Sequence, residues 1–201
     1  MFPLIYKAFR KAIFLLLNLF NRYITLIVLK GNKVDFKKFT TNGVPYLMVS
    51  RGGKMTLANN FSMNNGINGS PNGSRGKCAF FVDKGAVLII GENVGATQAT
   101  IRCHFKITIG NYVNIGRGTK IFDTDFHALD PAIRSSKEDL LHRKVSPVIV
   151  NDYAFIGAYS IILKGVTIGK NSIVGAGSVV TKSIPDNQIW AGNPAKFIRE
   201  V

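Results

Sequence analysis

The chain has 201 residues, 46% of them apolar, and a formal net charge of +15 at neutral pH. This length and composition allow one large domain, or a domain with an appendage, around a real hydrophobic core. The charge indicates an anionic partner, but no run of five consecutive basic residues supports a nucleic-acid-binding tail, and we expect no nucleic-acid partner. Cys78 and Cys103 have no metal-ligand spacing, so both are expected to be packed thiols in a reducing compartment.

Residues 1–33 are predicted to form a basic amphipathic helix, because the first thirty are apolar and basic with no acidic residue. They lack the cleavage site of a signal peptide, and Arg22 would be costly inside a membrane-spanning stretch. Two interpretations stay open. The helix lies in the membrane interface with Lys7, Arg10, Lys11 and Arg22 at the headgroups, or it packs on the protein or on another subunit. The further basic residues up to Lys38 favour an anionic leaflet.

From residue 34 the pattern becomes strand-like, and the Gly-, Asn- and Ser-rich segment 66–76 is expected to be irregular coil. A six-residue apolar phase begins at Ile90 and is clean at Ile109 and Ile115. It is longest in the last third of the chain, at Val150, Ile156, Ile162, Ile168, Val174 and Val180.

A period of six fits neither an α-helix nor a flat strand, and it is typical of a β-solenoid in which three short strands and three corners close one coil. The apolar residue of each block points inward and stacks on its equivalent in the next coil. Small residues follow it because a sharp corner tolerates little side-chain bulk. The sequence therefore predicts an all-β fold, a parallel β-helix over residues 34–184.

Two segments interrupt or end the repeat. Residues 123–147 show no six-residue phase and are predicted to form a protruding loop, a feature that is often functional inside a compact domain. Residues 185–201 form a C-terminal extension that is expected to leave the solenoid, because Pro185 and Pro194 oppose regular strand pairing.

His127 is the candidate catalytic residue, because it lies where the solenoid breaks into the loop and histidine is the natural general base near neutral pH. Asp125 and Asp123 are candidate partners, and either carboxylate could hold the imidazole in the tautomer that accepts a proton. A loop histidine beside ordinary turn aspartates is the alternative. His104, among strands, and His142, in a charged stretch, are expected to be structural or solvated.

Residues 156–200 and 106–131 resemble the hexapeptide-repeat acyltransferases, nearest to the bacterial polysaccharide and sugar O-acetyltransferases. The resemblance covers residues 85–200 and includes a histidine at the mouth of the loop. It implies a left-handed β-helix, a homotrimer with active sites between subunits, acetyl-CoA as donor and a sugar hydroxyl as acceptor. His127 would then deprotonate the acceptor, and the N–H of Ala158 would hold the oxyanion. The positions implied to contact CoA are Ala158, Ala176, Thr181, Lys182, Lys196 and Arg199.

The acceptor is less well defined, with Gln98, Asp125 and Trp190 as candidate contacts; Trp190 could equally be a packing residue. The leading interpretation is a cytoplasmic O-acetyltransferase acting on a cell-surface or lipid-linked glycan. Under this interpretation residues 1–30 contact the cytoplasmic face of the inner membrane. The alternatives are a xenobiotic acetyltransferase on the same fold and a non-catalytic binding solenoid. The three histidines do not suggest a shared metal site, and no metal is expected.

Overall fold

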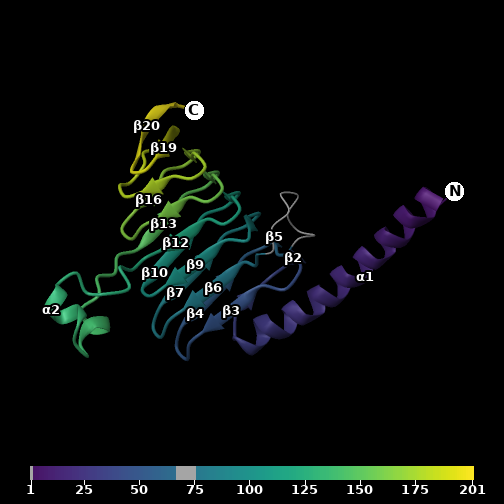
Figure 1. The fold of residues 1–201 in the computed structure, drawn as a ribbon, viewed down its shortest axis with the longest axis horizontal. Coiled ribbons are helices and arrows are strands. Elements are labelled where there is room, and N and C mark those ends of the chain that lie inside the picture. Colours follow the sequence, from purple (N-terminus) through teal and green to yellow (C-terminus); the bar gives the residue numbers. More distant parts are fainter. Residues whose placement is uncertain (1, 67–75) are drawn as a thin grey trace.

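The computed structural model describes residues 2–66 and 76–201, so most of the segment 66–76 lies outside the described residues. A long helix, α1 (Phe2–Gly31), leads into a solenoid of three sheets whose strands stack along one axis (Figure 1). The chain visits the three sheets, named here A, B and C, in the same order in every coil, and the pairings between coils are parallel. The parallel β-helix predicted from the six-residue period is thus confirmed.

The strands of each sheet are the following. Sheet A contains β1 (Asp35–Phe36), β4 (Lys54–Leu57), β7 (Val87–Ile90), β10 (Lys106–Ile109), β13 (Val148–Val150) and β16 (Thr167–Ile168). Sheet B contains β2 (Phe39–Asn42), β5 (Phe61–Asn64), β8 (Gly95–Thr97), β11 (Asn114–Ile115), β14 (Phe155–Ile156), β17 (Ile173–Val174), β19 (Gln188–Gly192) and β20 (Ala195–Glu200). Sheet C contains β3 (Tyr46–Val49), β6 (Ala79–Val82), β9 (Thr100–Cys103), β12 (Lys120–Phe122), β15 (Ile161–Ile162) and β18 (Val179–Val180).

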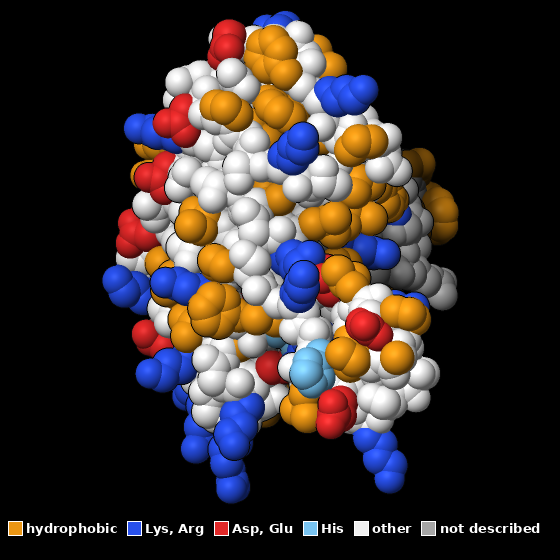
Figure 2. Space-filling model, turned by 90° about the vertical axis from the view of Figure 1, so that its left-hand side faces the viewer, with side chains coloured by type: hydrophobic (Ala, Val, Ile, Leu, Met, Phe, Trp, Pro, Cys, Tyr) orange, Lys and Arg blue, Asp and Glu red, His pale blue; other side chains and the backbone are white. Residues whose placement is uncertain are grey.

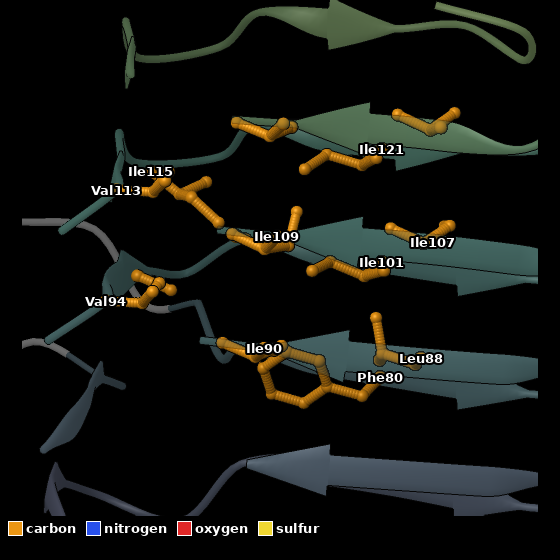
Figure 3. Close-up of a cluster of buried hydrophobic side chains, with 14 of the residues drawn as sticks. Phe80, Leu88, Ile90, Val94, Ile101, Ile107, Ile109, Val113, Ile115 and Ile121 are labelled. Carbon is orange, nitrogen blue, oxygen red and sulfur yellow. The ribbon is translucent and has the colours of Figure 1, made fainter. Parts of the chain in front are cut away.

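The core consists of apolar ladders that run along the solenoid axis (Figure 3). In sheet A, Ile109 pairs with Ile90 on one side and with Val150 on the other, and all three side chains are buried. In sheet C, Ile121 pairs with Ile101 and Ile162. Each residue of the six-residue phase therefore packs against its equivalents one coil away, which explains why the phase is so regular in the sequence.

The first coils are part of the same solenoid, although their sequence does not show the six-residue phase. Their strands are mostly four residues long, and their cores are filled by large side chains such as Phe39, Phe61 and Phe80. Phe61 and Phe80 meet edge to face with their ring centroids 6.1 Å apart. Leu57 and Ile90, which pair in successive coils of sheet A, lie 33 residues apart, whereas Val150 and Ile168 lie 18 apart, so the period of six is regular only in the later coils.

The C-terminal segment corrects one expectation. Residues 185–201 do not leave the sheets, because β19 pairs in parallel with β17, and β20 turns back antiparallel to β19. The two prolines permit this. Pro185 precedes β19, and Pro194 lies in the turn between the two strands, so neither has to donate a hydrogen bond within the ladder.

Candidate active site

The protruding loop leaves the solenoid between β12 and β13, at the corner where the chain passes from sheet C to sheet A. Its two ends are held side by side, because Asp125 N–H donates to Lys144 O at 3.0 Å and Ser146 N–H donates to Asp123 O at 2.9 Å. Beyond this neck the loop contains a short helix, α2 (Pro131–Arg134), and a 3₁₀ turn at Asp139–Leu141. The side chain of Asp130 caps α2 by accepting the N–H groups of its first turn.

His127 lies at the start of this loop with its side chain 61% exposed, and its partner is Asp139. The distance from His127 Nδ1 to Asp139 Oδ2 is 2.6 Å, while Asp139 Oδ1 accepts the N–H of Ala128 at 2.7 Å. The hydrogen bond from His127, and to a smaller extent the one from the Ala128 N–H, hold the pKa of Asp139 below its ordinary value. An ionised carboxylate at Nδ1 places the imidazole proton there and leaves Nε2 as the proton acceptor. On the face that carries the loop, a histidine and acidic side chains are exposed close together (Figure 2).

Neither carboxylate that we expected to orient His127 does so. Asp123 is fully buried, and its oxygens accept the backbone N–H groups of His104 and Phe105, each at 2.8 Å. Asp125 forms an ion pair with Lys164, with Nζ 2.6 Å from Oδ1. Both aspartates therefore hold the base of the loop to the solenoid. The true partner, Asp139, lies twelve residues after His127, a separation that no extended-chain pattern could show.

A second cluster missed by the sequence analysis lies under the loop and centres on His104. Its side chain is 2% exposed, its Nε2 accepts Arg102 Nε–H at 3.0 Å, and its Nδ1 lies 2.7 Å from Asp83 Oδ2. Arg143 of the loop reaches the same Asp83 oxygen at 3.6 Å. Burial lowers the pKa of His104 more than the Asp83 carboxylate raises it. The His104 ring also meets that of Phe126, which immediately precedes His127, edge to face. As expected, His104 has a structural setting and His142 lies exposed near Glu138.

The corner between sheets B and C carries the positions expected to meet the donor. Ala158 and Ala176 occupy equivalent places on it in successive coils, between β14 and β15 and between β17 and β18. The glycine before each alanine lets the coils approach, because a Cβ at Gly157 would meet the Ala176 nitrogen at 2.5 Å. Within the described residues neither alanine N–H donates a backbone hydrogen bond, so both can donate to a ligand.

The other proposed donor contacts divide between two places. Lys196 and Arg199 lie exposed on β20, and the preceding turn approaches the Ala176 corner, since Gly192 N–H donates to Ser178 Oγ at 3.0 Å. Thr181 and Lys182 are exposed after β18, at the corner between sheets C and A from which the His127 loop also emerges. Sheet C therefore separates Ala158 and Ala176 from His127 within one chain.

Gln98 and Trp190 are both engaged inside the fold. Gln98 is buried at the corner between sheets B and C, where its Oε1 accepts Arg117 Nε–H at 3.1 Å. Trp190 pairs with Val174 at the end of the sheet B ladder and packs against the core, which supports the packing interpretation. Neither offers an open acceptor site in this chain. Among the described residues no group of three or more His, Cys, Asp or Glu side chains could hold a metal ion.

Comparison with known proteins agrees with the solenoid fold. Residues 147–182 match a family model described as bacterial transferase hexapeptide (six repeats). A galactoside O-acetyltransferase of Escherichia coli is 36% identical over 118 residues, covering 58% of this chain and 56% of the relative. A hexapeptide-repeat acetyltransferase of Vibrio cholerae, solved with acetyl coenzyme A, is 32% identical with a TM-score of 0.51, covering 56% of this chain and 59% of that chain.

A crystal structure of a polysialic-acid-specific acetyltransferase covers more of the solenoid, at 83% of this chain and 85% of that chain, with 25% identity and a TM-score of 0.54. The chain spans about half the length of the curated relatives it matches, between 44% and 60% for the E. coli and Lactococcus lactis galactoside O-acetyltransferases and two yeast proteins. Residues 147–182 thus match the hexapeptide transferase repeat, and the chain is similar to hexapeptide-repeat acetyltransferases over somewhat more than half of its length.

Proposed function

We propose that this protein transfers an acetyl group from acetyl-CoA to a hydroxyl of a sugar, with His127 as the general base. The observation that carries the proposal is the pairing of His127 Nδ1 with Asp139 at 2.6 Å on a loop that stands out from a rigid solenoid. Relatives named galactoside O-acetyltransferase and a neighbour solved with acetyl coenzyme A support the reaction class.

The step follows from the atoms that the site presents. Nε2 of His127 takes the proton of the acceptor hydroxyl as its oxygen attacks the thioester carbonyl carbon. A corner N–H such as that of Ala158 donates to the oxygen that becomes negative in the tetrahedral intermediate. When the intermediate collapses, the C–S bond breaks, and the imidazolium returns its proton to the leaving thiolate of CoA. Asp139 remains ionised throughout and stabilises the positive imidazolium.

A trimer completes this site. His127 and Ala158 lie at different corners of the solenoid, with sheet C between them, so one chain does not bring base and oxyanion donor together. Three copies packed around a common axis can place the loop corner of one subunit against the alanine corner of the next. Lys196 and Arg199 of the alanine side would then attract the phosphates of CoA, and Thr181 and Lys182 would line the loop side of the same cleft.

The acceptor is proposed to be a glycan handled at the cytoplasmic face of a membrane. The polysialic-acid-specific neighbour, which matches 83% of this chain, supports a polymeric sugar over a small free one. The basic and apolar α1 supports an acceptor at a membrane surface. Asp125 is assigned to the loop base and not to the acceptor, because Lys164 occupies it.

The test is CoA thiol release from acetyl-CoA over a panel of soluble and lipid-linked sugars, comparing the wild type with His127→Ala. Acceptor-dependent release that falls by about 10²- to 10⁴-fold in the variant, with CoA affinity and oligomeric state unchanged, supports the proposal. Full activity in the variant would refute the base, and an absence of CoA binding in the wild type would refute the function.

A further inference from the structure

Helix α1 presents a continuous apolar stripe to the outside of the molecule. Phe9, Ile13, Leu16, Phe20, Tyr23 and Ile27 follow one another at alternating spacings of four and three, which places them on one side of an α-helix. They are large apolar or aromatic side chains left open to solvent: Phe9 is 65% exposed, Leu16 67% and Phe20 61%. The first half of the helix stands clear of the solenoid (Figure 1).

The opposite side of the same helix carries its polar residues, and the end of that side packs on the protein together with the apolar Leu26, Val28 and Leu29. Asn18, Asn21 and Thr25 share it, with Thr25 and the nearby Leu29 fully buried. Arg22 lies over the ring of Phe39 at 6.0 Å, beside a groove of about 440 Å³ between α1 and strands β2 and β5. A surface helix of a soluble protein normally turns its whole apolar stripe to the core, whereas the stripe of α1 from Phe9 to Ile27 stays exposed. The orientation of α1 therefore leaves the stripe to be covered by something else.

The basic residues of α1 indicate which kind of surface covers the apolar stripe. Lys7, Arg10 and Lys11 lie on the polar side of α1 beyond its contact with the solenoid, and α1 has no acidic residue. A coiled coil with this stripe as its seam would leave Lys7, Arg10 and Lys11 on its outer side without an acidic partner, because α1 has no acidic residue. An anionic phospholipid surface, in contrast, takes apolar side chains and basic side chains at once.

We infer that α1 lies in the plane of an anionic membrane, with the stripe from Phe9 to Ile27 in the lipid and the solenoid attached to the water side of the helix. The helix is long and apolar enough to cross a bilayer, but Lys7, Arg10 and Lys11 lie in its first half, and Thr25 and Leu29 in its second half are buried against the solenoid. The N-terminal end of the solenoid is then the end nearest the lipid. This inference does not rest on the proposed enzymatic activity.

The experiment places one label on each side of the helix. Cys78 and Cys103 are fully buried, and burial raises their pKa to about 11 and about 12, so an introduced cysteine is the reactive one. An environment-sensitive fluorophore is attached to Leu16→Cys or to Lys11→Cys of the full chain. On phosphatidylcholine vesicles containing phosphatidylglycerol, the label at position 16 is expected to shift to shorter wavelength and the label at position 11 to shift much less. Equal shifts at both positions would overturn the proposed orientation.

A substitution pair tests the energetics. Leu16→Asp with Phe20→Asp is expected to weaken vesicle binding by about 100-fold or more, since each change removes one large apolar side chain from lipid. Leu141→Asp, at a leucine on the loop that is 82% exposed, is the control and should leave binding unchanged. No binding of the wild type to any vesicle overturns the inference. So does a change of oligomeric state in the double variant without lipid, because the stripe would then be a contact between copies.

Discussion

Replacing Asp139 by Asn tests the proposed catalytic role of the loop with the least disturbance of its structure. The introduced asparagine would keep one oxygen for the Ala128 N–H, which the aspartate accepts at 2.7 Å, but would turn its NH₂ toward His127 Nδ1. The favoured imidazole tautomer would then carry its proton on Nε2 and could not accept one from the acceptor. A hydrogen bond to a charged group contributes about 1.5–3 kcal/mol, so the population of the reactive tautomer, and with it kcat, should fall by about 10- to 150-fold.

The assay is initial-rate CoA release at saturating acetyl-CoA, with kcat and KM measured for both substrates. We expect kcat to fall while KM for acetyl-CoA stays constant, because Asp139 lies on the loop and not at the alanine corner. In the double variant with His127→Ala the two losses should not add, since both act on one base. Additive losses, or an unchanged kcat in Asp139→Asn beside an inactive His127→Ala, would show that Asp139 does not orient the base.

Three further outcomes are expected. Replacing Lys196 and Arg199 by Ala should raise KM for acetyl-CoA more at low salt than at high salt, because exposed phosphate contacts are screened; a salt-independent change would argue against phosphate contact. Burial lowers the pKa of His104 below its ordinary value of 6.5, so the unfolded chain binds a proton at this histidine at higher pH than the folded chain does. The wild type should therefore lose stability as the pH falls below about 6.5. Chemical denaturation at several pH values should show a weaker dependence in His104→Gln. Ile109→Ala should lower the free energy of unfolding by about 2–5 kcal/mol, because Ile109 is 1% exposed between two other ladder residues; a loss below about 1 kcal/mol would contradict the close packing of this ladder.

The fold was accessible from the sequence where one residue per coil repeats in an identical environment. Ile109, Val150 and Ile168 pair in register in sheet A, so each must have similar size and shape, and the sequence records that as a period. The first coils were included in the predicted β-helix from residue 34, but they showed no six-residue period, because their repeat is longer and Phe61 and Phe80 fill their core. The C-terminal hairpin was missed because the effect of a proline depends on whether its nitrogen faces a neighbouring strand, and Pro194 lies in a turn.

Only part of the candidate site could be predicted from the sequence. His127 stood out because a loop interrupted the period directly before it. Its partner could not be found, because Asp139 comes back to His127 through the capped helix α2 and a 3₁₀ turn, and this folding leaves no spacing rule in the sequence. Asp123 and Asp125 were near in sequence, but a strand end buries the first against backbone N–H groups and gives the second to Lys164. Nearness in sequence therefore gave the wrong partner for His127, because the chain leaves the regular solenoid at this point.

Different residues of the loop orient His127 and fix the position of the loop on the solenoid. The strands on either side of it, β12 and β13, keep their pairings with the coils before and after, so the insertion does not interrupt the ladders of the core. The orientation of His127 is set inside the loop by Asp139, whereas the position of the loop on the solenoid is set at its base by Asp125 and by Asp83, which meets Arg143 of the loop. Changes at Asp139 should therefore act on kcat through the tautomer. Changes at Asp83 or Lys164 should move the whole loop, and alter the fit of the acceptor and of the adjacent subunit as well.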